Sequence, residues 1–409
     1  MNKRYYLNKL KTSLALLLVA GAFLCFSINV YGQEEEEQES GPDLTREAQV
    51  ALVAAQELYQ QEDFAGARKP LLEFLDTQPE VIPEILYVML GQCWYQDENF
   101  EEARKVWKEG YDAYPENDDM FRSYAVATFY GEHYAEAGRL FEEYYDLMEE
   151  KDIEILKNAA SSFYMGEELD EAKRVFKRMI DLPGDPNPEW LDTVIQICFE
   201  QEKIDETEEN ILMALDYYPL NTKYWQWLYN VRMQKEDYLG GTSALAIQYY
   251  IEPPEKKGDW KQLTDLYTYF NVPLRVAKTL PKSFENGVEE SQHIQIARAY
   301  ANAERIDEAV AYLDGVISKN PSSTLMLEKG RILFNARRNK EAIEALNDCI
   351  KFDPDNGDAY LYKGYAAWDL KDWETTREAF EGALDVPETK ALAKEYISFM
   401  DDLDEAKNE

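Results

Sequence analysis

One small or apolar residue returns ten times along this chain of 409 residues, at an almost constant spacing of 33 to 36 residues. The ten positions, called the first column below, are Ala55, Gly91, Ala125, Ala160, Ile195, Tyr229, Thr264, Ala297, Gly330 and Gly364. A period of this length indicates a small structural unit that buries its apolar face only by stacking on its neighbours. We therefore expect function to reside in an extended surface rather than in a catalytic pocket.

Three further columns keep the same register. Nine residues after the first column stands an aromatic or apolar residue: Phe64, Phe100, Tyr134, Leu169, Ile204, Tyr238, Ile306 and Trp373. Three residues later a mostly small one follows: Ala67, Ala103, Ala137, Ala172, Thr207, Gly241, Ala309, Ala342 and Thr376. Four residues later comes a large apolar one: Leu71, Trp107, Phe141, Phe176, Ile211, Leu313, Leu346 and Phe380. The last two columns share one face of a second helix, where short side chains let two helices approach closely.

The clearest copy of the pattern is Gly91…Trp94…Phe100…Ala103…Trp107…Pro115. With its period near 34 residues, the chain resembles the tetratricopeptide-repeat family. The resemblance implies an all-α fold, a superhelical solenoid of about ten helical hairpins that binds protein segments. Residues 389–409 follow the tenth unit, and Lys390 to Lys407 are expected to form a capping helix.

The amino terminus is a different kind of segment. Four basic residues precede an apolar stretch from Leu14 to Ile28, and Val30-Tyr31-Gly32 follows. This arrangement is typical of a secretory signal, so we expect residues 1–32 to be removed by cleavage after Gly32 and the product to be periplasmic. Retention of the segment as an anchor remains an alternative. Residues 33–45 are too acidic and polar to pack, and are expected to form a disordered tether.

Acidic residues dominate the chain, which carries a net charge of −37. Nucleic acid and anionic membranes are therefore poor partners. The charge is uneven: residues 33–254 hold 50 acidic and 18 basic residues, whereas residues 255–340 hold 11 and 14. We accordingly divide the repeats into an acidic part, 46–254, and a second part, 255–388. The acidic part either serves solubility alone or binds a basic partner.

The residues that carry most enzyme and metal chemistry are scarce. His133 and His293 are the two histidines, and three cysteines remain beyond the signal segment, Cys93, Cys198 and Cys349. These cysteines lie three or more units apart, too far for disulfides in a stacked array, so buried free thiols are expected. We predict no catalytic residues, no metal site and no cofactor, although an enzyme or a metal-binding protein remains a third class of function.

Two positions on each first helix are candidates for contact with an extended peptide. The residue after the first column is Gln92, Ser161, Gln196, Asn230, Asp265, Arg298, Arg331 or Tyr365. Three residues further on, aromatic side chains recur as Tyr95, Phe129, Tyr164, Phe199, Phe334 and Trp368. Polar groups supply main-chain hydrogen bonds to a peptide, and aromatic rings supply adaptable apolar contacts. The aromatic residues could instead fill the space between neighbouring first helices.

A more specific resemblance covers roughly the last half of the chain. It rests on Tyr224-Trp225-Gln226-Trp227-Leu228-Tyr229, Gln262 to Tyr267, Asn271 to Ala277, Glu285-Asn286-Gly287-Val288 and Tyr360 to Gly364. These segments are similar to tetratricopeptide proteins encoded beside ExbB, ExbD and TonB in Gram-negative bacteria. The resemblance implies a periplasmic scaffold that is accessory to TonB-dependent nutrient uptake and contacts TonB, ExbB or ExbD components. A scaffold for envelope or exopolysaccharide assembly would use the same fold.

Overall fold

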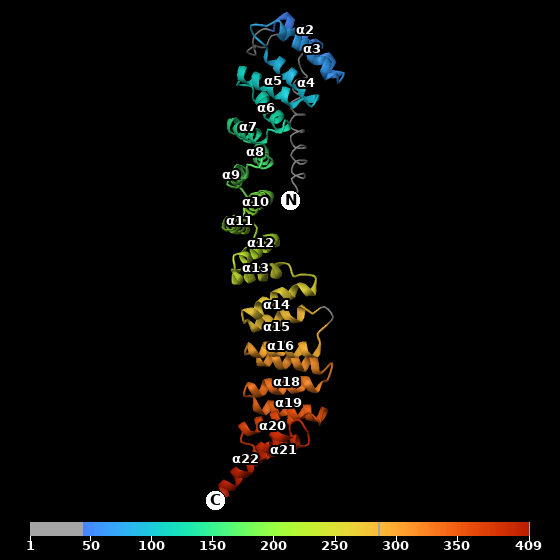
Figure 1. Ribbon diagram of the computed structural model, residues 1–409, viewed down its shortest axis with the longest axis vertical. Coiled ribbons are helices and arrows are strands. Elements are labelled where there is room, and N and C mark those ends of the chain that lie inside the picture. The colour runs from blue at the N-terminus through green and yellow to red at the C-terminus, as the bar shows by residue number, and fades with distance from the viewer. Residues whose placement is uncertain (1–43, 285–286, 409) are drawn as a thin grey trace. The chain divides into compact units, whose positions relative to one another are not determined.

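The computed structural model describes residues 44–284 and 287–408 (Figure 1). Over these residues the regular elements are helices, and no strand is present. The chain divides into two compact units, an amino-terminal unit that ends at Pro219 and a carboxy-terminal unit that begins at Leu220. This division falls between the fifth and sixth hairpins, earlier than the boundary at residue 254 that the charge distribution suggests. The signal segment 1–32 and nearly all of the tether lie outside the described residues.

The amino-terminal unit consists of five helical hairpins. Their helices are α2 (Arg46–Gln60), α3 (Phe64–Asp76), α4 (Glu84–Gln96), α5 (Phe100–Ala113), α6 (Asp118–Tyr130), α7 (Tyr134–Leu147), α8 (Ile153–Met165), α9 (Leu169–Ile180), α10 (Pro188–Glu200) and α11 (Ile204–Tyr217). Side chains cap most first helices, as where Asn117 accepts the backbone N–H of Met120 at 2.6 Å.

The carboxy-terminal unit adds five hairpins and a final helix. Its elements are α12 (Thr222–Gln234), α13 (Tyr238–Ile251), η1 (Lys257–Asp259), α14 (Trp260–Tyr269), α15 (Pro273–Thr279), η2 (Leu280–Lys282), α16 (Glu290–Asn302), α17 (Ile306–Ile317), α18 (Ser323–Asn335), α19 (Asn339–Phe352), α20 (Gly357–Asp369), α21 (Trp373–Leu384) and α22 (Lys390–Asn408). The predicted all-α fold of about ten helical hairpins with a capping helix is confirmed.

The first column lies where the two helices of each hairpin meet. All ten of its residues are buried. A Cβ atom on Gly91 would stand only 2.3 Å from Nε1 of Trp107, and one on Gly364 would stand 2.6 Å from Cε1 of Phe380. These two positions therefore leave no room for a side chain larger than that of glycine. Because the large column packs directly on the first column, the predicted register is confirmed.

The turn within each hairpin follows one geometry. In the second hairpin Glu98 has a φ of 55°, the backbone N–H of Glu98 bonds the carbonyl of Tyr95, and that of Asn99 bonds the carbonyl of Trp94. This left-handed helix end satisfies carbonyl groups that would otherwise lack partners. A residue with positive φ recurs seven residues after the first column in every hairpin: Glu62, Glu98, Glu132, Glu167, Glu202, Glu236, Asn271, Glu304, Arg337 and Lys371.

The two ends of the array differ slightly from the sequence prediction. Leu44 and Thr45, assigned above to the tether, belong to the folded part: Leu44 packs against the first hairpin, and the Thr45 hydroxyl accepts the N–H of Ala48 at the start of α2. At the other end α22 packs on the tenth hairpin through Ala393 and Met400, which are buried beside Phe380. The capping role predicted for this helix is thus confirmed by its contacts.

Candidate peptide-binding groove

A hollow of about 670 Å³ lies along the first helices of the eighth, ninth and tenth hairpins, α16, α18 and α20. It includes two of the sequence candidates, Arg298 and Arg331. The residues that line it are Arg298, Ala301, Asn302, Glu304, Ile306, Glu328, Arg331, Ile332, Asn335, Ala336 and Tyr362. The lining contains both apolar and hydrogen-bonding side chains, which suits an extended peptide better than a small charged molecule.

Arg298 of α16 and Glu328 of α18 form a bidentate ion pair across the hollow. The guanidinium Nε and Nη2 atoms donate to the two Glu328 carboxylate oxygens at 2.6 and 2.7 Å. These hydrogen bonds raise the pKa of Arg298 above its ordinary value. Glu328 is only 5% exposed, whereas the Arg298 side chain is 56% exposed. Arg298 therefore neutralises a buried carboxylate and still offers part of its guanidinium to a ligand.

Arg331 is held by the following first helix, α20. Its guanidinium carbon lies 4.7 Å from the ring centroid of Tyr362 on α20, and its Nη2 atom lies 3.5 Å from a carboxylate oxygen of Asp358. In both cases the residue after the first column contacts a residue of the following first helix, as Arg298 contacts Glu328. These contacts fix the orientation of the two arginines before any ligand arrives.

Asn302 and Asn335 also line the hollow, although sequence reasoning did not single them out. Each is the last residue of its first helix, and both are exposed. The signal in the sequence was an asparagine at the same column, five residues after Ala297 and Gly330, in two consecutive hairpins. A side-chain amide both donates and accepts hydrogen bonds, so this pair suits the main chain of an extended peptide.

The other polar candidates lie elsewhere and make local contacts. Asn230 accepts a hydrogen bond from Gln226 at 3.2 Å, and Asp265 accepts one from Lys261 at 2.9 Å, each within a single helix. In the amino-terminal unit Gln196 donates to Glu200 at 3.0 Å. Gln92 is half-buried and Ser161 is buried, so Ser161 is removed from the peptide-contact candidates.

The aromatic candidates mainly close the hairpin turns. Tyr95 packs on Phe100 with ring centroids 5.3 Å apart, and Trp368 packs on Trp373 at the same distance. Phe129 makes the same contact with Tyr134 and is 1% exposed, which removes it from the ligand-contact candidates. The structural interpretation of this column is therefore favoured.

The remaining aromatic candidates are half-buried. Tyr164 donates a hydrogen bond to Glu200 at 3.0 Å, and Phe199 lies on α10. Phe334 and Tyr365 pack together behind Tyr362, with centroids 6.3 Å apart, and so support the wall of the hollow without lining it. The structure thus gathers two of the fourteen candidates into one hollow and distributes the rest along the array.

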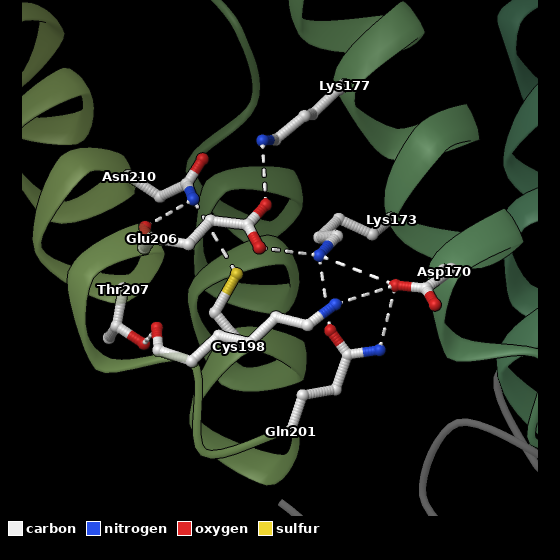
Figure 2. Close-up of polar contacts among 9 residues, drawn as sticks. Asp170, Lys173, Lys177, Cys198, Gln201, Glu206, Thr207 and Asn210 are labelled. Atoms are coloured by element: carbon white, nitrogen blue, oxygen red, sulfur yellow. Dashed lines mark hydrogen bonds and ion pairs between the residues drawn. The ribbon is translucent and has the colours of Figure 1, made fainter.

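Four basic residues of α9 reduce the negative charge that the amino-terminal unit presents. Figure 2 shows Glu206 of α11 between two of them: it accepts from Lys173 at 2.8 Å and from Lys177 at 3.2 Å. Lys173 is only 8% exposed and also donates to Gln201 at 3.1 Å. On the other side of α9, Glu142 of α7 accepts from Arg174 at 2.8 Å. Ion pairs from α9 thus link the second helices of three consecutive hairpins.

Replacing Glu206 with glutamine is expected to lower the free energy of unfolding at pH 7 by about 1–2 kcal/mol, because Lys173 keeps its burial and loses its closest anion. The Lys173 ammonium holds the pKa of Glu206 below its ordinary value of 4.5. A carboxylate with a lowered pKa contributes stability above pH 4.5 and loses it as the pH falls through the lowered value.

Urea unfolding of the wild type and of Glu206→Gln between pH 7 and pH 3 should therefore give curves that converge on acidification. Glu209→Gln, on the same helix and exposed, is the matched control and should follow the wild type. A constant difference between wild type and Glu206→Gln at all pH values would contradict the assignment.

The three described cysteines are free and buried, as predicted. Burial raises the pKa of the Cys93 thiol to about 12 and that of Cys349 to about 11.

Within residues 44–284 and 287–408, no cluster of three or more His, Cys, Asp or Glu side chains is placed to hold a metal ion. In this same part of the chain, no helix combines the length and apolar character needed to cross a bilayer.

Solved structures are similar to this chain only at low identity and low TM-score. Naa15/Naa10 bound to HypK-THB has a TM-score of 0.42 and 15% identity; the match covers 84% of this chain and 59% of that one. Yeast Tom70 has a TM-score of 0.28 and 11% identity, with 88% and 96% covered. A tetratricopeptide repeat protein from Parabacteroides merdae has a TM-score of 0.27 and 17% identity, with 59% and 96% covered.

Sequence comparison assigns the repeats directly. A search of curated proteins finds no match. The family model described as tetratricopeptide repeat matches residues 52–118, 294–356 and 327–390. The last two ranges contain the whole lining of the hollow. The matched segments, which make up fewer than half of the residues, are therefore similar to tetratricopeptide repeats, and in the structure they form helical hairpins.

Proposed function

We propose that this protein is a non-catalytic adaptor that binds an extended segment of a partner protein along α16, α18 and α20. The observation that carries the proposal is the hollow with Asn302 and Asn335 in successive hairpins and with Arg298 and Arg331 already oriented beside them. Neighbouring helices pack 8–10 Å apart, and an extended chain rises about 3.3 Å per residue. Each first helix would thus meet about every third residue of the peptide.

We further propose that the partner is a TonB, ExbB or ExbD component and that the protein serves TonB-dependent nutrient uptake in the periplasm. The support is the resemblance of the second half of the chain to proteins encoded beside these components. Cleavage after Gly32 belongs to the same proposal. The protein isolated from its host should then begin at Gln33, and a chain that begins at Met1 would remove the assignment to the periplasm.

The groove is tested by titrating the full exported chain with a fluorescent periplasmic fragment of TonB and measuring anisotropy. Asn302→Ala and Asn335→Ala should each weaken binding about fivefold, the cost of about one hydrogen bond. Asn347→Ala, on the second helix α19, is the matched control and should leave binding unchanged. Binding that ignores both groove variants would contradict the site, and absence of binding by the wild type would remove TonB as the partner.

The acidic amino-terminal unit offers a second contact for a TonB-type segment that is rich in lysine and proline. Residues 33–254, which include this unit and the sixth hairpin, have 50 acidic and 18 basic residues, and such a surface attracts a cationic chain. Arg298, Arg331, Arg337 and Arg338 of the near-neutral middle are proposed to meet an acidic or polar surface of a second protein. Within the chain, Arg337 pairs with Asp369 at 2.7 Å, and Arg338 pairs with Asp307 at 2.6 Å.

Salt separates the two contacts in the same titration. Exposed charges more than about 10 Å apart are largely screened at 0.1 M salt, so attraction by the acidic unit should fall steeply as salt rises. Hydrogen bonds in the groove should persist. Binding that is independent of salt would leave the acidic unit with a role in solubility alone.

A further inference from the structure

Three aromatic rings from three consecutive helices meet at the surface of the tenth hairpin. Trp368 of α20 stacks on Phe399 of α22 with ring centroids 5.8 Å apart, and packs edge to face with Trp373 of α21 at 5.3 Å. Phe399 is 51% exposed, Trp373 is 41% exposed and Trp368 is half-buried. We call these three residues the ring cluster. Because the rings hold one another, little side-chain freedom is left to lose when a ligand binds.

The ring that α22 adds distinguishes this hairpin from the others. A contact like that of Trp368 with Trp373 closes other hairpin turns, as between Tyr95 and Phe100, but those two rings are half-buried. Leu392 stands seven residues before Phe399, on the same side of α22, and is 40% exposed. A contiguous apolar surface of this kind, made by more than one helix, indicates a contact site.

Four exposed carboxylates stand close to the ring cluster in the sequence: Asp372, Glu374, Glu395 and Asp402. The first two flank Trp373. The other two lie four residues before and three residues after Phe399, and so share its side of α22. The aromatic surface is therefore bordered by negative charge on both α21 and α22.

The basic residues near the ring cluster do not cancel this charge. Two of them are paired with further carboxylates: Arg337 with Asp369 at 2.7 Å, and Arg377 with Asp401 at 2.8 Å. Lys371 is exposed in the turn before Trp373, and Lys394 is exposed on another side of α22 from Phe399. Residues 341–409 as a whole hold 19 acidic and 7 basic residues. The complementary ligand is thus cationic.

The chemistry of the rings specifies the ligand further. Within the chain, cations already lie over aromatic rings: the Arg68 guanidinium carbon is 4.0 Å from the ring centroid of Trp94, and the Lys282 ammonium is 4.1 Å from that of Trp260. Exposed rings bordered by carboxylates offer the same contact to a cation from another protein. Proline rings pack on aromatic side chains, and a proline-rich chain is already extended before it binds.

We propose that the ring cluster and its bordering carboxylates bind a partner segment rich in lysine and proline. Proline rings pack on Phe399 and Trp373, while lysine ammonium groups lie over the rings and pair with Glu395 and Asp402. This surface lies outside the lining of the hollow along α16, α18 and α20. The proposal does not depend on which protein carries the segment, nor on occupation of the hollow.

The test uses a fluorescent peptide of alternating lysine and proline, about 16 residues long and about 50 Å when extended. Anisotropy is measured with the full exported chain in about 0.15 M salt, where attraction by charges more than about 8 Å away is screened. The wild type should bind in the micromolar range. A glutamate–proline peptide of the same length should not bind, and a lysine–glycine peptide should bind more weakly.

Variants locate the binding. Phe399→Ala should raise the dissociation constant about fivefold through loss of ring contacts. Glu395→Gln should raise it about threefold through loss of one exposed ion pair. Glu395 is exposed, so this second variant keeps the test valid if Phe399→Ala loosens α22, which circular dichroism would detect.

Helix α19 supplies the matched controls. Phe352 is 54% exposed, and Asp348 stands four residues before it, as Glu395 stands before Phe399. Phe352→Ala and Asp348→Asn should leave binding unchanged, and so should Asn302→Ala in the hollow. No binding by the wild type, or equal losses for the Phe399 and Phe352 variants, would overturn the proposal. A larger loss with Asn302→Ala than with Phe399→Ala would place the peptide in the hollow instead, and equal affinity for the lysine–glycine peptide would remove proline from the recognised segment.

Discussion

Replacing Gly91 with alanine is expected to destabilise the protein by about 3 kcal/mol, the upper part of the usual range for overpacking a core. The added Cβ would stand 2.3 Å from Nε1 of Trp107, and Trp107 is 1% exposed, so its ring has no free space to enter. Relief requires the two helices of the second hairpin, α4 and α5, to separate. Separation would also loosen the contacts of Trp107 with Tyr95, whose ring centroid lies 5.9 Å away.

Gly315→Ala is the matched control for this substitution. Gly315 also lies inside a helix, α17, but its new Cβ would meet no atom within 4 Å. Removing a flexible glycine from a helix interior stabilises by about 0.5–1 kcal/mol. Urea unfolding followed by circular dichroism should thus shift in opposite directions for the two variants. A stabilised Gly91→Ala would mean that the first column does not contact the large column.

Arg298→Ala is expected to lower the free energy of unfolding by about 2–3 kcal/mol, because Glu328 is left buried without its guanidinium partner. The Glu328 carboxylate accepts two hydrogen bonds from Arg298, at 2.6 and 2.7 Å, and Glu328 is 5% exposed. The loss in free energy of unfolding should stay well below the loss for a fully buried ion pair, because water in the hollow reaches the exposed side of Arg298.

The double variant Arg298→Ala with Glu328→Gln separates the two contributions. Neutralising Glu328 removes the unpaired charge, so the double variant should be more stable than Arg298→Ala alone when both are unfolded in urea. If both variants lose the same stability, the ion pair contributes through the packing of Arg298 and not through charge. A stability loss also explains any loss of peptide binding by Arg298→Ala, which is why the asparagine variants test the groove more cleanly.

The repeat architecture can be predicted from the sequence because packing between the two helices of a hairpin requires small and large apolar residues at fixed spacings. Ala103 and Trp107 are predicted to share the face that meets the first helix, and both are buried in the structure. The column nine residues after the first proves to mark the start of the second helix, since Phe100, Ile204 and Trp373 each begin one. These features recur at one spacing, and ten copies make the register unambiguous.

The candidate site could be predicted only in part. Arg298 and Arg331 were found from their column, but their partners Glu328 and Tyr362 lie about one repeat further along the chain and were not. A contact between consecutive first helices depends on which two side chains face each other, and a column analysis treats each position separately. Asn302 lies five residues after the first column, a position outside the two columns that the sequence pattern proposes for peptide contact.

The sequence by itself determined the hairpins, their register, the buried cysteines and the capping helix, because each of these depends on helical periodicity and apolar burial within one repeat. Only the tertiary structure decided which side chains of a column are exposed to solvent. Phe129 is 1% exposed because Tyr130 and Tyr134 pack on its ring, whereas Phe334 in the same column is half-buried. Accessibility is a property of the neighbouring side chains, whose sizes vary from repeat to repeat, and so the same position is core in one hairpin and surface in another.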